Sequence, residues 1–259
     1  MMDSHRARKR FGQNFLHDRV IIDAIIRRFN PRPGQLVVEI GPGLGALTAP
    51  LLERLPQLYV VELDRDLIAR LRQRFDERLV IYEADALRFD FASLADEKQK
   101  LRVIGNLPYN ISTPLLFHLL EQADAISDMT FMLQKEVVQR MQARPGSKAY
   151  GRLSVMLQSR CMIEKVLDVG PGAFQPAPKV ESAVVQLTPL ATAPDPVCSD
   201  PCFGRLVAAC FAQRRKTLRN NLRNRLTAEQ IEATGIDPAR RAETLSLVEF
   251  VELARIYCR

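Results

Sequence analysis

The sequence of 259 residues has no tryptophan, three histidines and five cysteines. The cysteines are odd in number and widely spread, which argues against a disulfide framework and indicates reduced thiols in a reducing compartment. Only Cys198 and Cys202 are close together, and with so few histidines no second ligand pair accompanies them. The sequence therefore predicts no zinc site and no other metal site.

Long hydrophobic runs are also lacking, since no stretch approaches the roughly 18 uncharged apolar residues that a membrane span needs. The basic residues 5–10 lead into Gly12 and Gln13 rather than into the apolar run of a signal peptide. Apolar residues make up 47% of the chain and charged residues 26%, which is ordinary globular usage and excludes a disordered protein. We therefore expect a folded, monomeric, cytoplasmic protein with no membrane partner.

The net charge of +7 is concentrated in two segments. Residues 1–19 contain five basic and two acidic side chains, and residues 203–226 contain seven basic and no acidic ones. Two basic segments on an otherwise slightly acidic chain suggest a polyanionic partner, of which nucleic acid is the most common. Solvated arginine-rich helix faces remain the alternative.

Apolar patterns predict strands that alternate with helices. Asp18 is a candidate N-cap for a helix to about Arg28, which Pro33-Gly34 ends. Alternation of this kind predicts an α/β fold with a mostly parallel sheet and ligand sites at the carboxyl ends of its strands. The expected strands are 36–40, 58–63, 79–82, 101–104 and 129–133, and the expected helices are 46–54, 65–74, 113–122 and 135–142.

We expect a further helix from about Arg152. A hairpin-like pair of strands, at residues 166–169 and 182–187, is expected to complete the sheet. Residues 188–201 are rich in Pro, Ala and Thr, and the chain after Phe203 has a helical pattern. We therefore expect two domains, 1–190 and 191–259. In the second, Phe211, Leu218, Leu222 and Leu226 form an apolar stripe, and Arg215, Arg219 and Arg223 lie four apart on another face.

A glycine-rich loop, Gly41-Pro-Gly43-Leu-Gly45, lies between a predicted strand and a helix. With Ala46 it satisfies the dinucleotide pattern, and Glu62 follows where an acid would bind a ribose, so NAD remains an alternative. Glu39 would repel a pyrophosphate but would attract the ammonium and sulfonium of S-adenosylmethionine (SAM). The acidic lining therefore favours the cationic cofactor.

Carboxylates follow the next two strands as well. Glu62 can accept hydrogen bonds from both ribose hydroxyls, while Asp64 is expected to cap the following helix. Asp85 is positioned to accept from an adenine amino group, although a solvated loop carboxylate is the simpler interpretation of this residue alone. The placement of all three acids after successive strands favours a cofactor pocket.

The tetrapeptide Asn106-Leu107-Pro108-Tyr109 follows the fourth predicted strand. The exocyclic amine of adenine is a poor nucleophile, and the Asn106 Oδ1 and the Leu107 carbonyl can hold its two N–H bonds. Pro108 stiffens the turn, and Tyr109 can stack on a base. Asn106 as a helix cap is the structural alternative. Phe174, in a proline-rich loop, either closes on the other face of an extruded base or packs in the core.

Together these residues resemble the ribosomal RNA adenine dimethyltransferases, almost from end to end. Matching segments are 9–16, 39–48, 61–64, 83–85, 105–112, 144–152, 174–182 and 212–218. The resemblance implies a class I SAM-dependent methyltransferase fold, Rossmann-like with a seven-stranded sheet, and a small all-α C-terminal domain. By motif matching, SAM would contact Asn14, Leu16, Gly41, Glu62, Asp85 and Asn106. The target base would be held by Asn106, Leu107 (through its carbonyl), Tyr109 and Phe174, and Pro108 belongs with them to the catalytic set.

The implied activity is dimethylation at N6 of two adjacent adenosines near the 3′ end of 16S ribosomal RNA in the small subunit, late in ribosome biogenesis. Erythromycin-resistance methyltransferases, which modify large-subunit RNA, share the family, but the match in the C-terminal segment favours the small subunit. An NAD-linked oxidoreductase would leave Asn106–Tyr109 without a role. The third hypothesis is a non-catalytic RNA-binding assembly factor or transcription factor that keeps the fold.

Overall fold

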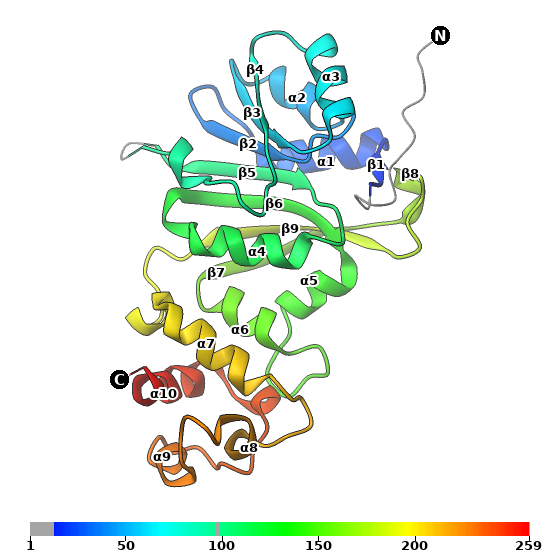
Figure 1. Cartoon of the computed structure of the whole chain (residues 1–259). Coiled ribbons are helices and arrows are strands. Elements are labelled where there is room, and N and C mark those ends of the chain that lie inside the picture. Colours follow the sequence, from blue (N-terminus) through cyan, green and yellow to red (C-terminus); the bar gives the residue numbers. More distant parts are fainter. Residues whose placement is uncertain (1–12, 97–98, 259) are drawn as a thin grey trace. The chain divides into compact units, whose positions relative to one another are not determined.

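The computed structural model describes residues 13–96 and 99–258, so most of the basic N-terminal segment lies outside the described residues (Figure 1). The chain divides into two compact units. The first runs to Val138 and includes Glu164–Pro189, and the second comprises Gln139–Ile163 and the chain from Leu190 onward. Within the described ranges, no helix is both long and apolar enough to cross a bilayer.

The first unit is built on a seven-stranded sheet, which confirms the expected fold class. The strand order is β4-β3-β2-β5-β6-β9-β7, with β9 antiparallel to β6 and the five preceding strands parallel to one another. The late strands do not simply extend the sheet in chain order, because β9 lies between β6 and β7. The strands are β2 Leu36–Ile40, β3 Leu58–Glu62, β4 Leu79–Glu83, β5 Leu101–Asn106, β6 Ile126–Gln134, β7 Cys161–Val169 and β9 Ser182–Pro189.

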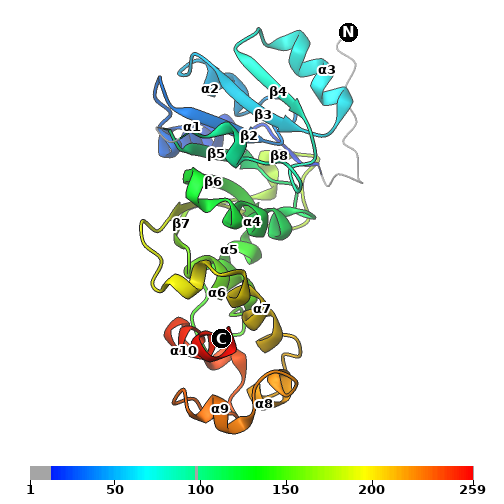
Figure 2. The same cartoon turned by 60° about the vertical axis from the view of Figure 1, so that its left-hand side comes forward.

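Helices connect these strands and cover both faces of the sheet, as Figures 1 and 2 show for α1 and α4. Asp18 caps α1 as predicted, since its carboxylate accepts from the backbone N–H groups of Val20 and Ile21. Asp64 likewise caps α3 by accepting from Asp66 N. The helices of this part are α1 Arg19–Phe29, α2 Thr48–Leu52, α3 Arg65–Arg74, α4 Ser112–Glu121 and α5 Lys135–Met141.

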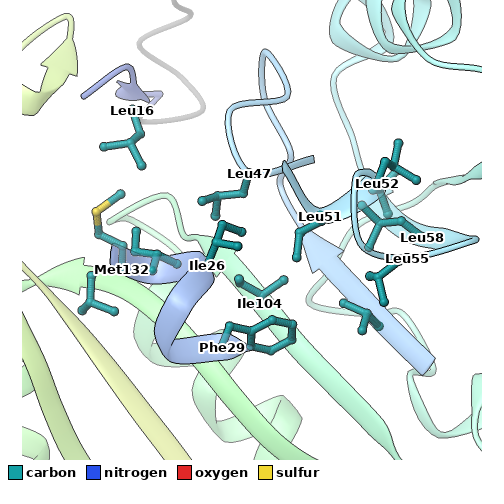
Figure 3. Close-up of a cluster of buried hydrophobic side chains, with 14 of the residues drawn as sticks. Leu16, Ile26, Phe29, Leu47, Leu51, Leu52, Leu55, Leu58, Ile104 and Met132 are labelled. Carbon is teal, nitrogen blue, oxygen red and sulfur yellow. The ribbon is translucent and has the colours of Figure 1, made fainter. Parts of the chain in front are cut away.

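One hydrophobic cluster fills the space between the sheet and helices α1, α2 and α3 (Figure 3). Alternate strand residues point to the same face of a sheet, so Val37, Val60 and Ile104 meet the apolar stripes of these helices. Phe29, at the end of α1, is fully buried in the cluster. This packing holds the carboxyl ends of β2, β3 and β5 at fixed positions.

A second, two-stranded sheet pairs β1 (Phe15–Leu16) with β8 (Phe174–Gln175). The strands are antiparallel, with Leu16 opposite Phe174, and His17 N donates to Ala173 O over 3.0 Å. The short pairing therefore joins the N-terminal segment to a loop more than 150 residues away in sequence.

The second unit is helical and has its own core, consistent with the expected small all-α domain. It also includes residues 139–163, which the predicted boundary at residue 190 places in the first domain. The difference arises because Tyr150 and Val155 are buried against α7 and α10, and a helical pattern does not say which core it joins. The helices are α6 Arg152–Gln158, α7 Pro201–Cys210, α8 Leu218–Leu222, α9 Ala228–Glu232 and α10 Leu247–Tyr257.

The predicted apolar stripe of this unit is buried at Leu218, Leu222 and Leu226. The arginines on the other face are exposed, but Arg215 lies in the turn between α7 and α8 and not on a helix with Arg219. The four-residue spacing therefore does not place all three arginines on one helical face.

The expectation of reduced cysteines is wrong for one pair. Cys202, in the first turn of α7, forms a disulfide with Cys258, the C-cap of α10, across a Cα–Cα distance of 5.8 Å. Counting and spacing missed this pair because the two residues are 56 positions apart and meet only when α7 packs on α10. Cys161, Cys198 and Cys210 are free and buried.

Candidate active site

A cleft of about 690 Å³, measured with its solvent-filled mouth, lies at the carboxyl ends of β2, β3 and β5. This is the edge at which an open α/β sheet binds its ligands. Four segments far apart in sequence line it. They contribute Gln13, Asn14, Phe15, Leu16, Glu39, Gly41, Pro42, Gly43, Leu44, Ala46, Leu47, Glu62, Leu67, Asn106, Leu107, Pro108 and Tyr109.

The glycine loop forms one wall of the cleft. Gly41 N donates to Val61 O over 3.0 Å, which fixes the loop to the neighbouring strand. Gly43 has a φ of +57°, and a Cβ there would lie 3.1 Å from the Phe15 ring. Only glycine combines this conformation with the close approach of Phe15, so the loop and the N-terminal segment form a continuous wall.

Glu62 ends β3 at the cleft and is 9% exposed. Its Oε1 accepts the backbone N–H groups of Leu63 and Asp64, each over 2.9 Å, and the carboxylate also bonds the backbone of Gly43. Burial raises the pKa of Glu62, while these backbone bonds lower it. The carboxylate is thus held in a fixed orientation at the cleft.

Glu39 lies in the same cleft and is 1% exposed. Thr48, in the first turn of α2, donates its Oγ1 proton to Glu39 Oε2 over 2.6 Å. Burial raises the pKa of Glu39 to about 8, with a further contribution from the nearby Glu62 charge. A cation bound beside Glu39 would restore its ionised form.

Asn106 is the last residue of β5 and lines the cleft. Its Nδ2 donates to the backbone carbonyl of Asn14 over 2.9 Å, which fixes the orientation of the amide. The Asn106 Oδ1 atom accepts no hydrogen bond from the described part of the chain, so it is available to accept one from a ligand. Asn106 does not cap α4, whose N-cap residue is Ile111.

The three residues after Asn106 continue along the cleft. Leu107 N donates to Met132 O over 3.2 Å, which keeps the turn attached to β6. Tyr109 is half-buried, and its hydroxyl lies 2.5 Å from Ser182 Oγ. Among the residues described, no backbone N–H donates to the Leu107 carbonyl, so the loop offers two oxygens, this one and the Asn106 Oδ1.

Two predicted site residues make local or core contacts in this structure. The Asp85 Oδ1 accepts from Leu87 N in the turn after β4, and the contact of Asp85 with the adenine of SAM stays a prediction. Phe174 is 2% exposed and packs in the core cluster with Leu16, which is the structural alternative that its sequence left open. Ser182 also meets Tyr109 in the folded protein, although nothing in its local sequence indicates this contact.

The cleft fits SAM and does not favour a dinucleotide. Two buried carboxyl groups, Glu39 and Glu62, suit a ligand that has an ammonium, a sulfonium and a ribose, because a nearby cation stabilises their ionised forms and a pyrophosphate does not. The Asn106 loop adds neutral acceptor oxygens at the same edge. Fold and cleft together define a class I SAM-dependent methyltransferase.

Comparison with known proteins gives the family. The family model described as ribosomal RNA adenine dimethylase matches residues 4–258, and the chain belongs to this family. Two relatives named ribosomal RNA small subunit methyltransferase A are similar along nearly their whole length. The protein of Laribacter hongkongensis is 61% identical, with 98% of this chain and 97% of the relative covered, and that of Alcanivorax borkumensis is 58% identical, with 98% and 91% covered.

Solved structures agree in fold. A dimethyladenosine transferase from Plasmodium falciparum superposes with a TM-score of 0.74 at 26% identity, covering 92% of this chain and 95% of the other. The 23S rRNA methyltransferase ErmE superposes with a TM-score of 0.69 at 25% identity, covering 95% and 100%. The NAD-linked alternative is therefore abandoned.

Proposed function

We propose that this protein transfers methyl groups from SAM to N6 of two adjacent adenosines near the 3′ end of 16S ribosomal RNA, within the small ribosomal subunit in the cytoplasm, during ribosome biogenesis. The choice of the small subunit is supported by relatives at 58–61% identity that carry that name, against 25% for the 23S rRNA enzyme. The observation that carries the chemistry is the fixed amide of Asn106, with its Oδ1 at the cleft.

When bound, SAM supplies an electrophilic methyl group on a positively charged sulfur. We assign its ribose to Glu62 and its cationic end to the region of Glu39, with Asn14, Leu16 and Gly41 forming the surrounding wall. Asp85, whose Oδ1 accepts from Leu87 N in the turn after β4, remains the proposed contact to the adenine amino group of SAM.

The protein acts on the target base by positioning it. The Asn106 Oδ1 and the Leu107 carbonyl accept the two N–H bonds of the adenine amine, which turns the nitrogen lone pair towards the methyl group. Tyr109 stacks on the base, and Pro108 holds the turn that presents these groups. Phe174 is buried in this structure, so the proposal assigns it no contact with the base.

Each transfer forms a nitrogen–carbon bond and breaks the sulfur–carbon bond, whose electrons remain on sulfur. The amine nitrogen becomes cationic and then loses its proton to solvent. Asn106 is neutral and cannot be a strong base, so proton loss follows methyl transfer. A second cycle on the monomethylated amine needs only one N–H acceptor.

Exposed cations of the helical unit are the proposed contacts to RNA phosphates. Arg215, Lys216, Arg219 and Arg223 are all exposed, and within the described chain no ion pair to a carboxylate involves any of them. Arg214, by contrast, pairs with Glu243 over 3.0 Å. Free cations that neutralise phosphates give salt-dependent, sequence-independent affinity.

The test is transfer of labelled methyl groups to small subunits that lack the modification, with the labelled nucleotides mapped. We expect Asn106→Ala to abolish transfer, by at least about 100-fold, while RNA affinity stays close to that of the unchanged protein. The matched control is Asn30→Gly, since Asn30 has a φ of 47° at the end of α1, where glycine is equally suited. Near-normal transfer by Asn106→Ala would remove Asn106 from the mechanism.

A further inference from the structure

One hydrogen bond joins the Asn106–Tyr109 loop to the strand that follows the Phe174 loop. The Tyr109 hydroxyl lies 2.5 Å from Ser182 Oγ. Ser182 is fully buried at the first residue of β9, whereas Tyr109 is half-buried and lines the cleft. The bond therefore reaches from the wall of the cleft to a point inside the sheet.

Ser182 is a fixed point. It pairs with Gln134 in the antiparallel ladder between β6 and β9. The residue before it is held twice, because Lys135 N donates to Glu181 O over 3.0 Å and Lys135 Nζ donates to Glu181 Oε2 over 2.9 Å. A side chain anchored to Ser182 is thus anchored to the central sheet.

We propose that Ser182 is a positioning residue for methyl transfer, whose hydroxyl holds the Tyr109 ring in the plane on which the target adenine stacks. This inference rests on the proposed function, because it needs Tyr109 to receive a base. A tyrosine ring without an anchor at its hydroxyl can turn about two side-chain bonds, and each stacking event must then order it again. With the bond to Ser182, the Tyr109 ring is already ordered in the folded protein, so stacking a base on it costs less conformational entropy.

The Tyr109 phenol is suited to such an anchor and not to proton transfer. Burial raises the pKa of Tyr109, so the hydroxyl keeps its proton at neutral pH. A neutral phenol and a serine hydroxyl can each donate to the other, and either direction fixes the ring. The bond therefore needs no change of protonation during the reaction.

The test measures single-turnover methyl transfer, SAM affinity and base stacking in separate assays. We expect Ser182→Ala to lower the transfer rate at subsaturating RNA by about 3- to 10-fold, the effect of re-ordering one side chain, and to leave SAM affinity unchanged. Ser182→Thr, which keeps the hydroxyl, should recover most of the rate. Ser159→Ala is the matched control, because Ser159 is equally buried but donates only to Met156 O of its own helix.

Stacking is read from RNA with 2-aminopurine at the target position, whose fluorescence is quenched against an aromatic ring. The chain has no tryptophan to interfere. Ser182→Ala should weaken the quenching, and Tyr109→Phe should weaken it by the same factor. In the double variant the two losses should not add, because both remove one bond.

Additive losses, or a Ser182→Ala variant with unchanged transfer and quenching, would overturn the role of Ser182. Reduced SAM affinity together with a lowered melting temperature would also overturn it, because these mark a general structural defect. An unaltered protein that transfers no methyl group to RNA would instead refute the proposed function, so the two failures are distinguishable.

Discussion

Replacing Glu39 with glutamine should make the cofactor-free protein more stable and its cofactor site weaker. Glu39 is 1% exposed and accepts one hydrogen bond, from Thr48. Glutamine has the same shape, keeps a carbonyl oxygen for that bond, and has no charge to bury. The effect on stability must therefore depend on pH, because only the carboxyl group titrates.

The magnitude follows from the pKa of Glu39, which burial raises from 4.5 to about 8. The folded chain holds this proton more tightly than the unfolded chain. Protonation of Glu39 therefore adds its full contribution to the free energy of unfolding below pH 4.5. This contribution is lost as the pH rises towards 8. The loss is about 1.4 kcal/mol per pH unit in this window and reaches about 4 kcal/mol at pH 7.5.

Urea unfolding from pH 5.5 to 7.5 checks this prediction. The free energy of unfolding of Glu39→Gln should exceed that of the unchanged protein by about 1 kcal/mol at pH 5.5 and by about 3 to 4 kcal/mol at pH 7.5. A difference that does not vary with pH would refute the reasoning, because it would mean that Glu39 titrates alike in the folded and unfolded chains.

The same substitution separates stability from function. A cation beside Glu39 favours the carboxylate, so SAM binding at pH 7 should release close to one proton, measurable by titration calorimetry in buffers of different ionisation enthalpy. Glu39→Gln should release none and should bind SAM about 10- to 100-fold more weakly, the worth of one hydrogen bond to a charged group. Equal proton release by both proteins would assign the proton to another residue.

Two further predictions concern the helical unit. Neutralising Arg219 and Arg223 together to glutamine should reduce the slope of log affinity for RNA against log salt by about 1.5 to 2, and an unchanged slope would exclude both from phosphate contacts. Reduction of the Cys202–Cys258 disulfide should lower the free energy of unfolding of this unit by about 2 to 4 kcal/mol, as expected for a separation of 56 residues. The Cys202→Ser variant should lose the same free energy of unfolding, and its stability should not depend on reductant. Equal stability of the unchanged protein with and without reductant would contradict this prediction.

The sequence by itself determined the features that depend on near neighbours in the chain. Asp18 and Asp64 cap the helices that follow them because a cap bonds backbone N–H groups two or three residues away. The spacing of apolar residues predicted the strands and the helices that connect them. Their alternation along the chain then predicted that Glu62 and Asn106 lie at the same edge of the sheet. Such features need only local geometry and the rule that parallel strands end at the same side.

Only the tertiary structure decided which distant residues meet. It paired Cys202 with Cys258, joined Tyr109 to Ser182, and fixed the Asn106 amide on the Asn14 carbonyl. It also buried Phe174 in the core, where the sequence allowed either a core or a cleft position.

The physical reason is the same in each case. A side chain's environment depends on the elements that pack around it, and periodicity and spacing carry no information about contacts across 50 to 150 residues. Glu39 shows this most clearly: the sequence identifies a carboxyl group beside a glycine loop, but burial in the folded protein, together with the nearby Glu62 charge, raises its pKa to about 8. The sequence thus specified the chemical groups of the site, and the fold set their orientation, pairing and charge.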